Sequence, residues 1–171
     1  MTSSTRFANL NLLADIQESV ESLSESSYNE CLSRISESPL FHIDFSSISR
    51  IIYFASRVRP LSTALLIKLA IDLCKKSQDF QTAFLEDLFS NQYPNAGRFY
   101  FLFKCFENEL FSIDVVSTKI DYLFTKNRVK FATSLFAWFA PELETSSPEQ
   151  FQKFTKPPED TLDSYDSDLQ Q

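Results

Sequence analysis

The sequence predicts an all-α fold, and three observations support this class. The chain of 171 residues contains one glycine, Gly97, and 18 phenylalanines. Glycine provides the positive-φ positions of tight hairpins and of phosphate-binding loops, so few such turns are available here. Apolar residues recur at spacings of three and four, whereas no segment alternates as a half-buried strand does. We expect eight or nine short helices around a phenylalanine-rich core, in a compact orthogonal bundle or in stacked helical hairpins.

The first half of the chain contains four predicted helices, over about residues 7–23, 28–35, 45–57 and 61–76. The first two are expected to form a hairpin across a serine-rich segment. Asp44 or Ser46 caps the third helix, because a short polar side chain accepts a hydrogen bond from an unpaired N–H of the first turn. Pro60 suits the start of the fourth, where its missing N–H has no intrahelical partner. The fourth helix is apolar in nearly every direction, so we expect it to be central and buried.

Further helices are predicted over residues 80–89, 98–107, 113–124, 129–139 and 148–154. Between the first two of these, residues 93–97 predict a turn. Ser112 and Ser147 are in position to cap helices, and Gln150 completes a capping box with Ser147. The segment Ala140-Pro141-Glu142 is expected to end the helix over 129–139, because proline cannot donate the hydrogen bond that continues it.

Charge divides the chain into a helical domain, residues 1–156, and a disordered acidic tail, residues 157–171. Residues 142–171 carry eight acids and two lysines, so they contribute −6 of the formal charge of −7. A segment with many acids and few apolar residues buries too little surface to fold. No residue pattern repeats at a fixed period, which favours the bundle over an array of repeats.

The sequence also predicts the compartment. Its three cysteines are far apart and never form a Cys-x-x-Cys pair, which fits neither a secreted disulfide framework nor a zinc site. Residues 1–11 lack the pattern of a signal peptide. The most apolar stretches, residues 61–74 and 131–141, are shorter than the roughly 20 residues of a membrane span. We expect an intracellular, cytoplasmic protein that does not enter a membrane.

Residues that could carry out catalysis are scarce. His42 is the one histidine, so a nucleophile–histidine site would have to use it. It is expected at the edge of the core with a hydrogen-bond partner. Neighbouring acids, Glu86 with Asp87 and Glu107 with Glu109, are expected to be solvated. Since no glycine-rich phosphate loop is present either, we expect no catalytic residue, no metal ligand and no cofactor.

Two groups of residues are candidates for binding a partner. Arg57 and Arg59 belong to a basic segment, although cations also stabilise helix C-terminal ends, where both are predicted to lie. Trp138 and Phe139 are consecutive in an aromatic helix and cannot both face the core. One of them could therefore be an exposed anchor for a protein partner.

Three segments resemble a known family: residues 51–60 (Ile-Ile-Tyr-Phe-Ala-Ser-Arg-Val-Arg-Pro), residues 106–114 (Phe-x-x-x-Leu-Phe-Ser-Ile-Asp) and residues 136–144 (Phe-Ala-Trp-Phe-Ala-Pro-Glu-Leu-Glu). They are similar to the helical region that precedes the repeats in ankyrin-repeat proteins of trichomonad-like protists. The similarity spans about residues 40–145. It implies a helical module whose function in that family is unknown, and this chain has no ankyrin repeat.

These observations lead to a non-enzymatic helical module that binds a protein partner. The alternative is a nucleic-acid-binding protein in which basic helix ends contact phosphates and the acidic tail competes for them. The near-neutral body and the acidic tail repel polyanions at long range, which favours the protein partner.

Overall fold

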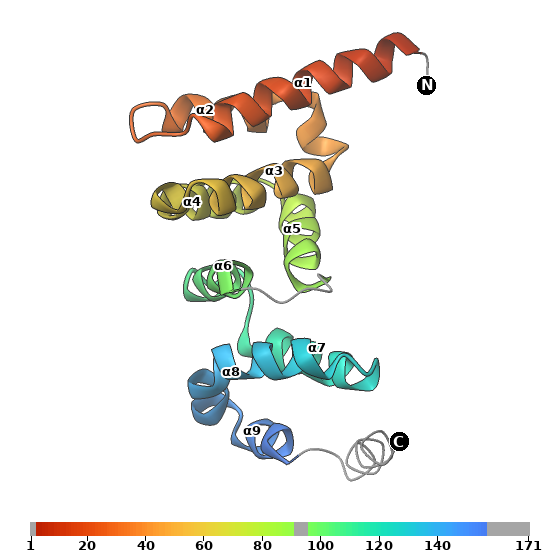
Figure 1. Ribbon diagram of the computed structural model, residues 1–171, viewed down its shortest axis with the longest axis vertical. Coiled ribbons are helices and arrows are strands. Elements are labelled where there is room, and N and C mark those ends of the chain that lie inside the picture. The colour runs from red at the N-terminus through yellow and green to blue at the C-terminus, as the bar shows by residue number, and fades with distance from the viewer. Residues whose placement is uncertain (1–2, 91–95, 157–171) are drawn as a thin grey trace, which may run out of the picture. The chain divides into compact units, whose positions relative to one another are not determined.

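A computed structural model describes residues 3–90 and 96–156, and within them every regular element is helical (Figure 1). The all-α prediction is confirmed for this part of the chain. The α-helices are α1 (Ser3–Glu21), α2 (Tyr28–Glu37), α3 (Phe45–Val58), α4 (Thr63–Lys76), α5 (Gln78–Ser90), α6 (Ala96–Glu107), α7 (Ile113–Thr125), α8 (Val129–Ser146) and α9 (Pro148–Thr155). Two 3-10 helices, η1 (Pro39–His42) and η2 (Pro60–Ser62), precede α3 and α4. The predicted tail, residues 157–171, and residues 93–95 of the predicted turn lie outside the described residues.

The chain divides into two compact units, Met1–Leu110 and Phe111–Gln171. The sequence prediction of one helical domain over residues 1–156 does not distinguish them. The first unit contains α1 to α6, and the second contains α7 to α9.

Stacked helical hairpins build the first unit. α1 packs on α2, α3 on α4, and α5 on α6. Successive hairpins meet through the contacts α1–α3, α2–α4, α3–α5 and α4–α6, and Figure 1 shows α1 with α2 in one layer and α3 with α4 in the next. Of the two predicted arrangements, this unit has the stacked one, which needs similar neighbours in space but no repeated sequence.

Phenylalanine rings fill the core of the first unit. Phe41 of η1 lies 5.3 Å from Phe80 of α5, measured between ring centroids. Phe80 stacks on Phe84 at 5.8 Å, and Phe84 meets Phe101 of α6 edge-on at 6.4 Å. All four side chains are buried, so this chain of rings joins η1, α5 and α6 through burial and aromatic contact.

The predicted central helix, α4, is buried as expected. Seven of its residues are buried, and it contacts α2, α3, α5 and α6. It begins at Thr63 rather than at Pro60, because Pro60 starts the separate turn η2. Between the two predicted caps of α3, the structure selects Asp44, whose carboxylate accepts a hydrogen bond from the Ser47 N–H at 3.3 Å.

The second unit has α7 packed along α8 and α8 packed on α9. Phe136 lies between Phe151 and Phe154, at centroid distances of 5.5 and 5.9 Å. The prediction that Ala140-Pro141-Glu142 ends a helix is wrong, because α8 continues to Ser146 with Pro141 inside it. The continuation buries Leu143 completely, which offsets the hydrogen bond that proline cannot make.

Two predicted caps occupy the right positions without making the expected bonds. Ser112 and Ser147 are the N-cap residues of α7 and α9, but neither side chain accepts a capping hydrogen bond within the described residues. The amide oxygen of Gln150 is buried and has no partner there, so the predicted capping box does not form. Pro148 occupies the first position of α9, as expected.

Candidate functional site

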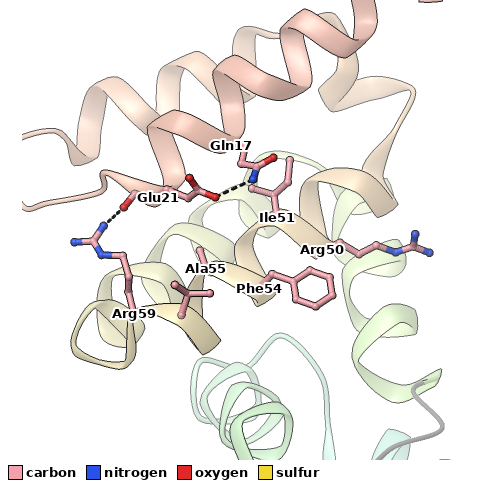
Figure 2. Close-up of a pocket in the computed structure, with 8 residues that line it drawn as sticks. Gln17, Glu21, Arg50, Ile51, Phe54, Ala55 and Arg59 are labelled. Carbon is pink, nitrogen blue, oxygen red and sulfur yellow. Dashed lines mark hydrogen bonds between the residues drawn. The ribbon is translucent and has the colours of Figure 1, made fainter.

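A groove between α1 and α3, here called the α1–α3 groove, combines apolar and charged side chains in its lining. Its volume is about 520 Å³. Figure 2 shows the side chains that line it, two from α1 and five from α3, with Arg59 following α3: Gln17, Glu21, Arg50, Ile51, Phe54, Ala55, Val58 and Arg59. Because α1 and α3 belong to neighbouring hairpins of the same unit, the groove is a product of hairpin stacking.

The helix α3 is apolar on two faces. Its inner face buries Ile48 and Ile52 completely, together with most of Ala55. Its outer face carries Phe54, which is 54% exposed, and Val58, which is 80% exposed. Leu61 in the following turn η2 is also fully exposed. Large apolar side chains at a spacing of four on the solvent side of a helix are typical of a contact surface.

Arginines lie near the exposed apolar side chains of α3. Arg50 and Arg57 are exposed, and no ion pair within the described residues involves either of them. Arg59 is half-buried and donates from Nη1 to the main-chain carbonyl of Glu21, the last residue of α1. A guanidinium at this position satisfies a carbonyl that has no partner within its own helix. Arg59 therefore fixes the end of α1 at the groove.

Glu21 supplies the one negative charge in the lining. Its Oε1 accepts a hydrogen bond of 2.8 Å from Nε2 of Gln17, one helical turn earlier, as Figure 2 shows. In the lining, Arg50 and Arg59 against Glu21 leave a charge of +1, and Arg57 on the adjoining exposed face of α3 adds one more, in a chain whose total formal charge is −7. The groove thus differs in sign from the chain as a whole.

The four residues predicted to bind a partner have different environments. Arg59 lines the groove, and Arg57 lies on the exposed face of α3 beside Phe54 and Val58. Phe139 is completely buried, 6.3 Å from the ring of Phe111, so it belongs to the core of the second unit. Trp138 is 37% exposed on α8. Sequence reasoning missed Phe54 and Val58, and the one signal for them is that they extend the apolar character of α3 beyond its core face.

His42 is exposed at the end of η1, and its ring meets the edge of Phe41 at 5.4 Å. The expected hydrogen bond is not found, since no such bond joins the His42 side chain to another residue of the described ranges. Asp87, expected to be solvated, instead accepts a hydrogen bond from Oγ of the buried Ser49 and thereby joins α5 to α3. Glu107 is exposed and pairs with Lys104 at 2.7 Å.

The three cysteines, Cys31, Cys74 and Cys105, are buried free thiols. Burial raises the pKa of the Cys31 thiol to about 11 and that of Cys74 to about 12, because the thiolate loses its hydration. The pKa of Cys105 is raised further, by burial and by the nearby Cys74. Over residues 3–90 and 96–156, no group of three or more His, Cys, Asp or Glu side chains is arranged to hold a metal ion.

Comparison with family models, with curated proteins and with solved structures finds no match for this chain. The resemblance to the helical region of ankyrin-repeat proteins therefore stays a prediction. Among the described residues, no helix combines the length and the apolar character that crossing a membrane requires.

Proposed function

We propose that this chain is a non-enzymatic protein interaction module, and that its binding surface is the α1–α3 groove. The occupant is an amphipathic helix from a partner protein. An unpartnered groove between two helices accepts such a helix with its apolar side chains at the positions i, i+3, i+4 and i+7. The added helix would continue the helix-on-helix packing by which the unit is already built.

The observation that carries this proposal is the outer face of α3. Exposed single apolar residues are common on proteins, but Phe54 and Val58 are one turn apart and line the same hollow. Burying them beneath a partner removes apolar surface from water, at about 25 cal/mol for each Å². Such buried aromatic and aliphatic anchors contribute most of the binding energy of many interfaces.

Peptide display against the folded full-length protein tests the proposal. We expect enrichment of amphipathic helical peptides whose affinity falls about tenfold or more when Phe54→Ala and Val58→Ser are combined. The control is Val115→Ser together with Tyr122→Ala, because Val115 and Tyr122 are exposed to 44% and 51% on α7, in the other unit. Equal loss in both double variants, or no enrichment of helical peptides, would argue against the groove.

A nucleic acid is the second candidate partner, and one observation favours it. Tyr122 is exposed on α7, and the Nζ atoms of Lys119 and Lys126 lie 4.9 and 5.8 Å from its ring centroid. Exposed aromatic rings among cations are used to stack bases of single strands. In this proposal the binding surface would be α7 rather than the groove. The Val115 and Tyr122 variant should then lose affinity for single-stranded nucleic acid, and the Phe54 and Val58 variant should keep it.

A further inference from the structure

The charges around the α1–α3 groove identify the kind of helix that fits it. Resting on the proposed function, we infer that the partner helix is acidic along the flank that lies over α3. Arg50 and Arg57 lie four and three residues from Phe54, and Val58 lies four residues after Phe54, so the two arginines border one edge of the exposed stripe that Phe54 and Val58 form. An apolar stripe bordered by carboxylates matches this order.

Arg50 and Arg57 are available for such pairing. Both side chains are exposed, and neither forms an ion pair or a hydrogen bond with another described residue. Two other cations of the first unit are already engaged, because Arg34 pairs with Glu30 and Lys104 pairs with Glu107. A guanidinium binds a carboxylate with two parallel hydrogen bonds, which favours acidic side chains over other polar groups.

Glu21 gives the groove a second, opposing charge. It lies on the α1 wall, where it would repel an acidic helix and weaken its binding. This opposition provides a sharp test, because removing a positive charge from α3 and removing the negative charge from α1 should change affinity in opposite directions. Glu21→Gln retains an oxygen that can accept the hydrogen bond from Gln17.

The shape of the site argues against an anionic membrane as the partner. The hollow lies between two helices, so a partner helix can fill it whereas a flat bilayer surface would contact only its exposed rim. The exposed apolar residues and arginines could nevertheless attract anionic lipid. Vesicles with and without phosphatidylserine therefore belong in the test.

Two synthetic peptides of about 18 residues provide the probe, a length that covers the exposed side of α3. Both carry leucine on one helix face, and their flanks contain glutamate in one peptide and lysine in the other. We expect the glutamate peptide to bind the full-length protein about tenfold more tightly at low salt, and the difference to shrink to about twofold near 0.5 M salt.

Single charge variants then locate the effect. Arg50→Gln and Arg57→Gln should each weaken binding of the glutamate peptide about threefold, and Glu21→Gln should strengthen it about twofold. Arg128→Gln, an exposed cation before α8, is the matched control and should change nothing.

The outcomes separate the two proposals. If both peptides bind equally, or the lysine peptide binds better, the acidic partner is rejected and the groove is retained. If neither peptide binds, both proposals fail. If phosphatidylserine vesicles bind with dependence on Arg50 while the peptides do not, the surface is a lipid-binding one and the inference is overturned.

Discussion

At the scale of single residues, burial controls the acid–base behaviour of the cysteines. The pKa of Cys74 rises to about 12 in the folded chain because its thiolate would be poorly hydrated. In the unfolded chain the thiol ionises near its ordinary pKa of 9.0. Below about pH 9 the thiol is protonated in both the folded and the unfolded chain, so the raised pKa does not change the free energy of unfolding. Above it the unfolded chain ionises first, so stability falls as pH rises.

We predict that the free energy of unfolding decreases above about pH 9, and that Cys74→Ala makes this decrease shallower by about 1.4 kcal/mol per pH unit. Urea unfolding under reducing conditions at about pH 8, 9, 10 and 11 measures the slope. The small cavity left by the substitution shifts the whole curve without altering its dependence on thiol ionisation. An unchanged slope would show that Cys74 is accessible to water.

Two residues with a left-handed backbone were not located from the sequence. Glu109 and Asn127 have φ of 61° and 58°, just after α6 and α7. In each case the next N–H bonds back to the helix, from Leu110 to Cys105 O at 3.0 Å and from Arg128 to Leu123 O at 2.8 Å. Glycine is the usual residue here. Gly97 instead lies in the first turn of α6, and positive φ is not found at it.

At the scale of elements, α3 explains both what periodicity reveals and what it misses. Ile48, Ile52 and Ala55 were identifiable as a core face, because they recur at helical spacing. Phe54 and Val58 continue the same apolar character around the helix. A single sequence does not say whether such a second face meets another helix of the chain or the solvent, since that depends on which hairpins stack.

The helix α8 gives a prediction about its internal proline. Pro141 cannot donate a hydrogen bond to the carbonyl of Ala137, and it is exposed. We expect Pro141→Ala to raise the free energy of unfolding by about 1–2 kcal/mol. This gain is smaller than the roughly 3 kcal/mol that proline costs inside a helix, because alanine also raises the conformational entropy of the unfolded chain. Thermal and urea unfolding measure this change.

Pro148→Ala is the matched control for that experiment. Pro148 occupies the first position of α9, where no intrahelical bond is lost, so its replacement should give no gain. If Pro141→Ala instead lowers stability, the proline ring contributes packing that outweighs the missing hydrogen bond.

At the scale of the whole molecule, the amino-acid composition was enough to predict the fold class but not to predict the candidate binding site. One glycine and 18 phenylalanines indicated helices packed by aromatic rings, and Phe80, Phe84 and Phe101 form such a core. The groove depends on contacts between residues more than 30 positions apart, such as the bond from Arg59 to Glu21. Patterns of neighbouring residues do not predict such contacts. Arg59 could therefore be predicted from the sequence as a candidate binding residue, but its position at the groove could not be predicted.

In the proposed function, a partner helix lies in the α1–α3 groove and covers part of α1 and α3. Amide hydrogen exchange of the full-length protein, with and without the glutamate peptide or a peptide selected by display, tests it most directly. We predict new protection confined to the second half of α1 and to α3, around Gln17, Glu21, Phe54 and Val58. Protection that falls instead on α7 or α8, around Tyr122 or Trp138, with α1 and α3 unchanged, would show that the partner binds elsewhere and not in the groove.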